Sequence, residues 1–342
     1  MHRAKIELGI RKNNLDLVRL FAAGLVIYSH SYVLLGLPDT PMLWQTPGAV
    51  GVYMFFAISG YLIARSWDAD PHLGRFLIRR ALRIFPALIV CVLLTVFVLG
   101  PLLTTLTLAE YLSNGQTWTY LQNAVLHITY HLPGVFASNP FPHAINGSLW
   151  SLPVEFSLYL LVAIFGVFRR TGRWTWLVIF ALTGAVCHWW AYPGSLRMVI
   201  YGMDLSQLAI SGIYFIAGVC FHRYGAHRLF STSSVFIALL LLQALMIWPL
   251  IDRLLSWILL PWVVLGFGLA YSPWLGKLVR YGDYSYGTYI YAFPIQQTLV
   301  HLLPRIDHIS FLLLSFAITI PVAVVSWHLI EKPALSLKPG SR

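Results

Sequence analysis

One long apolar stretch carries two titratable side chains, Arg19 and His30, eleven positions apart. Eleven residues of α-helix return to nearly the same face and span about 16 Å along the axis. If this stretch crosses a membrane, both groups are costly to bury and are therefore candidates for function. His30 would act as a general base or proton carrier, or it would be a hydrogen-bonded structural histidine. Arg19 would bind an anion near one membrane surface, or it would only anchor the helix there.

The carboxylate of Glu155 lies in another apolar stretch and is the only acidic group well inside any predicted span. Counted from the predicted helix ends, Glu155 and His30 both lie about 8–9 Å below the same membrane surface. This equal depth predicts that the carboxylate pairs with the imidazole, orienting it and raising its basicity. The alternative is a buried carboxylate that bonds to Ser148, to Ser151 or to a backbone group freed by Pro153.

Basic side chains crowd just before a third apolar stretch. Arg75, Arg79 and Arg83 recur every four residues and so share one face of a helix, and Arg80 lies beside them. Planar guanidinium groups bind phosphate through paired hydrogen bonds, and several together suit a polyphosphate. The cluster therefore predicts a phosphate site, or else an ordinary anchor on anionic lipid heads.

The elements that must position these side chains are membrane helices. The chain has 342 residues, of which 58% are hydrophobic and only 10% are charged, and its mean hydropathy is +0.72. A soluble domain is about 25% charged, so the composition excludes a disordered chain, a coiled coil and a soluble nucleic-acid-binding protein. A span needs about 20 apolar residues. The sequence therefore predicts an all-α polytopic membrane protein. Its ten expected transmembrane helices are Leu15 to Leu35, Gly48 to Ala64, Leu82 to Leu102, Leu149 to Phe168, Trp174 to Trp190, Leu205 to Phe221, Ser231 to Leu250, Leu254 to Tyr271, Tyr284 to Leu303 and Ile309 to Ile330.

The basic residues predict how these spans are oriented. Lys and Arg prefer cytoplasmic loops, and ten spans with both termini in the cytoplasm place 20 of the 23 Lys and Arg residues there. Gln116 to Leu132 is a polar eleventh candidate that would reverse this arrangement, so it is predicted to be interfacial or re-entrant. A single domain is expected over 1–342, with cytoplasmic segments at 1–14 and 331–342 and a long extracytoplasmic loop at 103–148. The three cysteines fall within spans and predict neither a disulfide framework nor a metal site.

Six short motifs follow one another along the chain. They are Arg19 with His30; Gly51-Val52 with Phe55-Phe56 and Ile58-Ser59-Gly60-Tyr61-Leu62-Ile63; Arg79-Arg80 with Arg83-Ile84 and Pro86; Trp150-Ser151-Leu152 with Val154-Glu155; Ser285-Tyr286-Gly287 with Tyr289 and Pro294; and Ile330-Glu331-Lys332-Pro333. In type and order they resemble the motifs of the membrane acyltransferase 3 family, which modifies cell-surface glycans and related acceptors. Each motif alone is weak, but six in order on the predicted topology are specific. Two positions depart from the family pattern: Phe156 stands where many members have a second acid, and Ala292 where many have histidine.

The resemblance implies an integral-membrane O-acyltransferase. Such an enzyme moves an acyl group, often acetyl, from cytoplasmic acyl-CoA to a hydroxyl group of an extracytoplasmic or lipid-linked glycan. It implies His30 as the catalytic residue, and Glu155 would orient His30 or hold the acceptor. The donor phosphates would be held by Arg19, Arg79, Arg80 and Arg83. The expected partners are acyl-CoA, a surface polysaccharide or lipid-linked sugar, and the lipids of a bacterial inner membrane, without nucleic acid.

Two other functions remain open on the sequence. A secondary transporter would also use ten spans, with His30 and Glu155 in proton coupling, although the two halves of the chain lack the inverted repeats typical of transporters. A lipid-binding or scaffold protein without chemistry would leave the equal depth of His30 and Glu155 as a coincidence.

Overall fold

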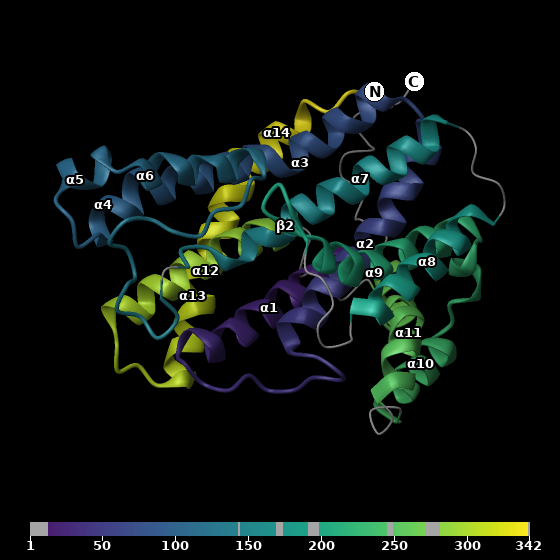
Figure 1. Cartoon of the computed structure of the whole chain (residues 1–342). Coiled ribbons are helices and arrows are strands. Elements are labelled where there is room, and N and C mark those ends of the chain that lie inside the picture. The colour runs from purple at the N-terminus through teal and green to yellow at the C-terminus, as the bar shows by residue number, and fades with distance from the viewer. Residues whose placement is uncertain are drawn as a thin grey trace.

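The computed structural model describes residues 13–142, 144–168, 174–190, 198–244, 249–270, 272 and 281–340. Most of this chain is helical, and the long helices pack side by side (Figure 1). The long helices are α1 (Leu15–Leu34), α2 (Pro47–Ala69), α3 (Leu73–Leu94), α7 (Ser151–Val167), α8 (Thr175–Trp190), α9 (Leu205–Arg223), α10 (Thr232–Ala244), α11 (Pro249–Leu269), α12 (Ser285–Leu302) and α13 (His308–Ser326). The short helical elements are η1 (Thr95–Leu99), α4 (Gly100–Leu103), α5 (Leu108–Ser113), α6 (Gly115–Thr119), η2 (Tyr120–Val125), η3 (Gly147–Trp150), η4 (Ala226–Leu229), η7 (Trp327–Glu331) and α14 (Lys332–Ser336). Strands β1 (Val199–Ile200) and β2 (Met203–Asp204) form a small antiparallel hairpin.

Each of the ten predicted spans overlaps one of the long helices. In the described part of the chain, six helical stretches are long and apolar enough to cross a membrane. These six are Leu15–Leu34, Pro47–Ala69, Leu73–Leu103, Gly147–Val167, Leu205–Arg223 and His308–Ser336. Shorter apolar helices cover Thr175–Trp190, Thr232–Ala244 and Arg253–Leu269. The predicted all-α membrane architecture is confirmed, whereas the number of ten crossings and the side on which the termini lie stay predictions.

Helices α3 and α13 extend furthest beyond their predicted spans. Helix α3 begins at Leu73, ahead of the predicted Leu82, and continues through the π-helical turn η1 to Leu103. Hydropathy excluded its first turns because they carry three arginines, but His72 caps this end by accepting a hydrogen bond from the backbone of Arg75 at 3.3 Å. Helix α13 likewise continues through η7 and α14 to Ser336, so the first residues of the predicted C-terminal tail are helical.

The predicted long loop folds into short helical turns. Helix α5 starts with a capping box between Thr107 and Glu110, and these hydrogen bonds hold the pKa of the Glu110 carboxyl below its ordinary value. Turn η2 packs against α3, and Asn123 binds the backbone and side chain of Thr129. Within the described residues of 116–132 no helix reaches the length of a span, as expected for an interfacial segment.

Helix α2 lies at the centre of the bundle, against α1 and α9. Glycines allow this close approach: a Cβ atom at Gly51 would lie 2.5 Å from the carbonyl oxygen of Ala22, and one at Gly60 would overlap the carbonyl of Phe215. Small residues at such contacts let membrane helices approach through their backbones. Helix α2 can therefore carry its motif residues into the middle of the molecule.

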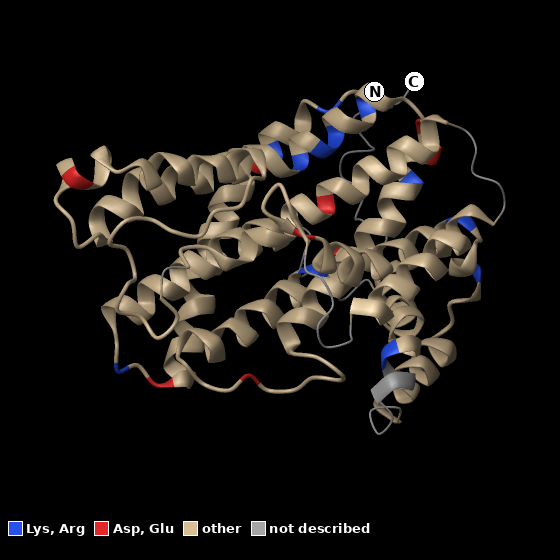
Figure 2. Cartoon of the chain, in the orientation of Figure 1, with Lys and Arg blue, Asp and Glu red and all other residues tan. Residues whose placement is uncertain are grey.

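The densest group of basic residues lies on the first turns of α3, beside α14 (Figure 2). We call the part of the molecule around Arg75, Arg79, Arg80 and Arg83 the basic end. Helices α1 and α12 begin near the basic end. Asp283, just before α12, forms an ion pair with Arg83, and Arg19, near the start of α1, approaches the same carboxylate. Helices α2 and α7 run toward it, and Gly166 near the end of α7 packs against Trp67 near the end of α2.

Candidate active site

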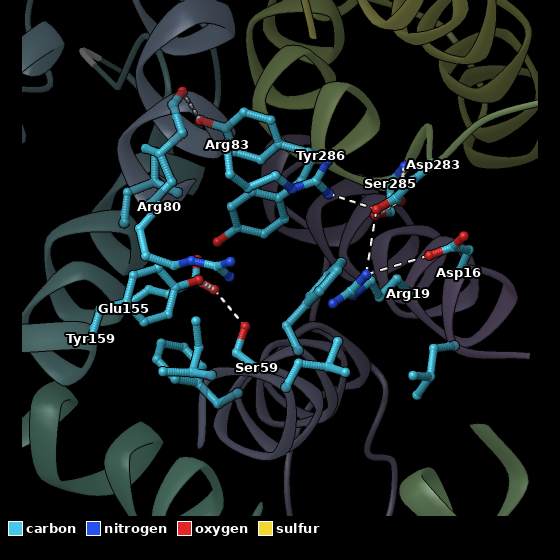
Figure 3. A pocket seen from close by; sticks show the side chains of 18 of the residues that line it. Asp16, Arg19, Ser59, Arg80, Arg83, Glu155, Tyr159, Asp283, Ser285 and Tyr286 are labelled. Carbon is cyan, nitrogen blue, oxygen red and sulfur yellow. Dashed lines mark hydrogen bonds and ion pairs between the residues drawn. The ribbon is translucent and has the colours of Figure 1, made fainter. Parts of the chain in front are cut away.

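A cavity of about 410 Å³ lies near the basic end, bordered by α1, α2, α3, α7 and α12. Its walls carry four of the six predicted site residues: Arg19, Arg80, Arg83 and Glu155 (Figure 3). Neither Arg79 nor His30 belongs to the lining. The structure therefore brings together the predicted cations and the predicted carboxylate, but it separates them from the predicted catalytic histidine.

One buried carboxylate, that of Asp283, is shared by two cavity arginines. Its Oδ2 lies 2.7 Å from Nη2 of Arg83 and 3.4 Å from Nη1 of Arg19 (Figure 3). Asp16 also approaches Arg19 at 3.4 Å, and Glu331 approaches Arg83 at 3.6 Å. These ion pairs join the beginnings of α1 and α12 to α3 and to the end of the α13 helix.

Local backbone features place the two carboxylates that hold Arg83. Asp283 accepts hydrogen bonds from the backbone nitrogen of Ser285 at 3.3 Å and from its hydroxyl at 2.5 Å, at the start of α12. Glu331 closes the π-helical turn η7 and accepts a hydrogen bond from the hydroxyl of Ser326 at 3.2 Å. Such turns occur frequently at functional sites, and here the turn lies beside the cavity.

Arg80 is the cavity arginine for which the described residues supply no ion-pair partner. Its Nε is buried without a hydrogen bond, and its guanidinium carbon lies 5.8 Å from the centre of the Phe76 ring. Figure 3 shows the side chain reaching across the wall toward Glu155 and Tyr159. Glu155 attracts Arg80 electrostatically but forms no direct ion pair with it. A partly buried guanidinium that is not directly paired favours the binding of an anion at this point.

Arg79, the neighbour of Arg80, has a different environment. Its Nη1 lies 2.8 Å from Asp70, in the turn between α2 and α3, and Asp70 also forms two hydrogen bonds with Arg75, at 2.5 and 2.9 Å. The hydrogen bonds from Arg75 and Arg79 hold the pKa of the Asp70 carboxyl well below its ordinary value. The prediction that Arg79 joins the other arginines at one site is therefore not supported, because Asp70 binds it outside the cavity lining.

The carboxylate of Glu155 is held by hydroxyl groups. Ser59 of α2 donates to Oε1 at 2.6 Å, and Tyr159, one turn further along α7, donates to the same oxygen at 2.5 Å (Figure 3). Within the described chain neither an ion pair nor a hydrogen bond joins Glu155 to His30. The predicted pairing of these two residues was wrong for this structure.

The depth of the two groups explains this correction. Helices α1 and α2 are antiparallel, and Gly48 packs against Ser29 while Gly51 packs against Ala22. Continued along α2, this register puts Ser59 level with the first turn of α1, about 20 Å from His30 along the helix axis. Because Glu155 binds Ser59, it lies near the basic end. Equal counts from predicted helix ends did not mean equal depth.

His30 lies near the opposite end of α1. The centre of its ring is 4.9 Å from that of Phe293 on α12, in an edge-to-face arrangement, and its Nδ1 is buried without a hydrogen-bond partner among the described residues. Gly147 packs against the Phe293 ring, since a Cβ atom at Gly147 would lie 2.6 Å from a carbon of that ring. An imidazole without a fixed partner is free to accept a proton from a bound hydroxyl group.

Tyr289 lies between the cavity and His30. It lines the cavity, whereas Phe293, one helical turn further along α12, contacts His30. The Tyr289 hydroxyl donates to the backbone oxygen of Ser148 at 2.8 Å and lies 2.6 Å from the hydroxyl of Ser151. On α2 the lining reaches no further than Val52, which the register with α1 puts about 10 Å short of His30.

Sequence reasoning missed most of the partners of the arginines. Asp283 directly precedes the span predicted from Tyr284, and an acidic residue at the basic end of a span was a usable signal. Glu331 was noticed as part of a motif but received no role. Tyr159 lies one helical turn after Glu155, a spacing that brings two side chains together, so it could have been proposed as a partner.

Comparisons with known proteins identify the family of this chain. The family described as "Acyltransferase domain" matches residues 12–329. An O-acetyl transferase of Shigella phage Sf6 is 31% identical over 337 residues, covering 95% of this chain and 97% of that protein. Nodulation protein 10 of Rhizobium leguminosarum is 29% identical over 370 residues, covering 96% and 94%. The peptidoglycan O-acetyltransferase OatA of Listeria monocytogenes is 26% identical over 188 residues, covering 51% of this chain and 26% of that protein. No solved structure gives a significant match.

A helical membrane bundle with this cavity, matched over nearly its whole length, is that of a membrane acyltransferase. The chain belongs to the acyltransferase 3 family. It is an enzyme of the O-acetyltransferase type.

Proposed function

We propose that this enzyme moves an acyl group, with acetyl the expected one, from cytoplasmic acyl-CoA to a hydroxyl group of an extracytoplasmic or lipid-linked glycan. Its membrane would be the inner membrane of a bacterium, with the basic end in the cytoplasm. The observation that carries the proposal is the cavity at the basic end, where Arg80 forms no direct ion pair with any described residue. The names of two relatives, an O-acetyl transferase and a peptidoglycan O-acetyltransferase, support the acyl group and the class of acceptor.

The phosphates of the donor would bind at the arginines. Arg80 offers a guanidinium that forms no direct ion pair with a described carboxylate, and Arg19 and Arg83 lie on the other side of the same cavity. Guanidinium groups suit phosphate because their planar donors match its oxygens. The positive charge favoured on cytoplasmic surfaces agrees with entry of the donor from that side. The acyl arm would then extend away from the charges, toward Val52 and Tyr289.

The chemical step would take place beyond this arm, at His30. The imidazole would take the proton of the acceptor hydroxyl while that oxygen attacks the thioester carbonyl. The bond from the carbonyl carbon to the new oxygen forms, the carbon–sulfur bond breaks, and CoA leaves as its thiol after protonation. Since Tyr289 and Phe293 separate the cavity from His30, their side chains would turn aside for the thioester and the histidine to meet. Glu155, which binds Ser59 and Tyr159, would act at the donor end.

The test compares two neighbouring arginines with the histidine. The affinity of the purified protein for CoA is measured by calorimetry, and surface glycans of expressing cells are analysed by mass spectrometry for acyl groups. Arg80→Gln should weaken CoA binding at least tenfold, because hydrogen bonds to charged groups are worth about 1.5–3 kcal/mol. Arg79→Gln is the matched control and should change the affinity by less than about twofold. His30→Ala should bind CoA like the wild type, and its cells should lose the acyl groups.

Three results would contradict the proposal. Equal effects of the two arginine substitutions would show that the donor does not bind in the cavity. Normal glycan acylation in cells that express His30→Ala would show that the histidine is not needed for the reaction. Unchanged glycans in cells that lack the whole protein would exclude a glycan acceptor.

A further inference from the structure

The end of the cavity that lies away from the basic end has a definite set of walls. They are contributed by three helices, and their members are Val52, Phe55, Ser151, Leu152 and Tyr289. We call this set the far end of the cavity. Its residues follow from the direction of each helix: Val52 is the lining residue of α2 nearest its start, and Tyr289 is the lining residue of α12 furthest along it.

The side chain of Tyr289 closes the far end and is held in place. Its hydroxyl group is bonded at 2.8 Å to the backbone oxygen of Ser148 and at 2.6 Å to Ser151. The centre of its ring lies 5.7 Å from that of Phe55, in an edge-to-face arrangement. A large aromatic side chain fixed at both its ring and its hydroxyl keeps this end closed when the donor binds, because well-packed interiors resist the insertion of extra atoms. It would turn aside only for the chemical step, after the donor has bound.

We propose that the far end is the acyl-binding part of the donor cavity and that Tyr289, with Phe55, restricts the donor to short acyl groups. The inference rests on the proposed function, since it assumes that the donor phosphates lie at the arginines. With the phosphates there, the only part of the cavity left for the uncharged end of the donor is the far end. The mixed lining suits a short group: Val52, Phe55 and Leu152 are apolar, whereas Ser151 and Tyr289 carry hydroxyls that are already bonded to each other.

The expected effect of opening the wall follows from hydrophobic burial. Each methylene group removed from water favours binding by about fourfold. A butyryl group has two methylenes more than acetyl, so it should gain about fifteenfold in affinity once there is room for it. In the wild-type cavity the same two groups would overpack against Tyr289. Butyryl-CoA should therefore bind the wild type at least tenfold more weakly than acetyl-CoA.

Binding measurements test this without knowledge of the acceptor. The dissociation constants of CoA, acetyl-CoA and butyryl-CoA are measured by calorimetry for the wild type, Tyr289→Ala, Phe55→Ala and Tyr289→Phe. In both alanine variants butyryl-CoA should bind about fifteenfold more tightly than acetyl-CoA. This reverses the preference of the wild type, and the affinity for CoA itself should be nearly unchanged. Tyr289→Phe loses the hydroxyl but keeps the ring, so it should still prefer acetyl-CoA.

The matched control is Tyr291→Ala. Tyr291 is on the same helix, two residues on, and lines a different, apolar groove between α3, α12 and α13, so its removal should leave the ratio of butyryl-CoA to acetyl-CoA affinity unchanged. If Tyr289→Ala fails to fold, Phe55→Ala tests the same wall from another helix. Unchanged ratios in both alanine variants would overturn the inference while leaving the donor site intact. Absence of CoA binding to the wild type would instead overturn the proposed function.

Discussion

Replacement of Asp283 with asparagine should have opposite effects on stability and on donor binding. The substitution keeps the shape of a side chain that is 4% exposed, but it removes the carboxylate shared by Arg19 and Arg83. Breaking a buried ion pair by removing one partner costs about 3–5 kcal/mol. Here Asp16 and Glu331 still approach the two arginines, at 3.4 and 3.6 Å, so we expect a loss of about 2–3 kcal/mol in the free energy of unfolding.

The effect on donor binding has the other sign because the carboxylate repels a phosphate. The repulsion between Asp283 and a phosphate charge about 8 Å away is about 2 kcal/mol at an effective dielectric constant of about 20. Screening by salt reduces this value. We therefore expect the asparagine variant to bind CoA about tenfold more tightly than the wild type, and the difference should shrink as the salt concentration rises.

The assay is calorimetric titration with CoA at two salt concentrations, together with thermal unfolding with and without CoA. Asp70→Asn is the matched control, because Asp70 is also a buried carboxylate shared by two arginines but lies outside the cavity lining. It should lower the unfolding temperature without changing the affinity for CoA. If Asp283→Asn binds CoA no more tightly than the wild type, the shared carboxylate does not face the donor phosphates and the reasoning fails.

Two further predictions concern the scaffold. Gly60→Ala should lower the free energy of unfolding by about 1–3 kcal/mol, because the new methyl group overlaps the carbonyl of Phe215; Gly212→Ala, where the nearest atom of Leu158 lies at 3.5 Å, is the control and should be nearly neutral in thermal unfolding. The lowered pKa of Asp70 stabilises the folded state above the ordinary aspartate pKa of about 4, and this stabilisation is lost as the pH falls below it. The unfolding temperature of the wild type should therefore drop more steeply between pH 5 and pH 3 than that of Asp70→Asn, and parallel curves would show that the carboxylate contributes nothing.

The sequence predicted the basic part of the site well because spacing along one helix is local information. Arg19 and Arg83 were placed at one surface by residue type and by helical periodicity, and the structure brings both to one cavity. The same periodicity could not separate Arg79 from Arg80. What separates them is Asp70, a residue in a turn, whose position depends on how α2 and α3 meet. A local pattern predicts which helix face carries the arginines. The contacts with the neighbouring helix decide which of these arginines is left without an ion-pair partner.

Contacts between helices were predicted less well, for a physical reason. The depth of His30 and Glu155 was counted from helix ends that the sequence locates only within a few residues. An error of one turn at each end shifts the relative depth by about 11 Å, which is enough to join or separate two side chains. The register between helices depends on particular small residues such as Gly48 and Gly51, whose partners on α1 a single sequence does not reveal.

The charges of the cavity indicate how a donor would bind and leave. Among the described residues that line it there are four cations and three carboxylates, with Lys338 the fourth cation. A near balance of charge limits the cost of desolvating these groups while the cavity is empty. A polyphosphate entering this space meets one excess positive charge together with carboxylates that oppose it. Binding that is too tight would slow the release of CoA after each transfer. By competing for Arg19 and Arg83, the carboxylate of Asp283 would lower their affinity for CoA and speed its release. This account predicts that the tighter binding of Asp283→Asn will be accompanied by slower release of CoA, measurable by rapid dilution of the bound complex; release as fast as in the wild type would contradict it.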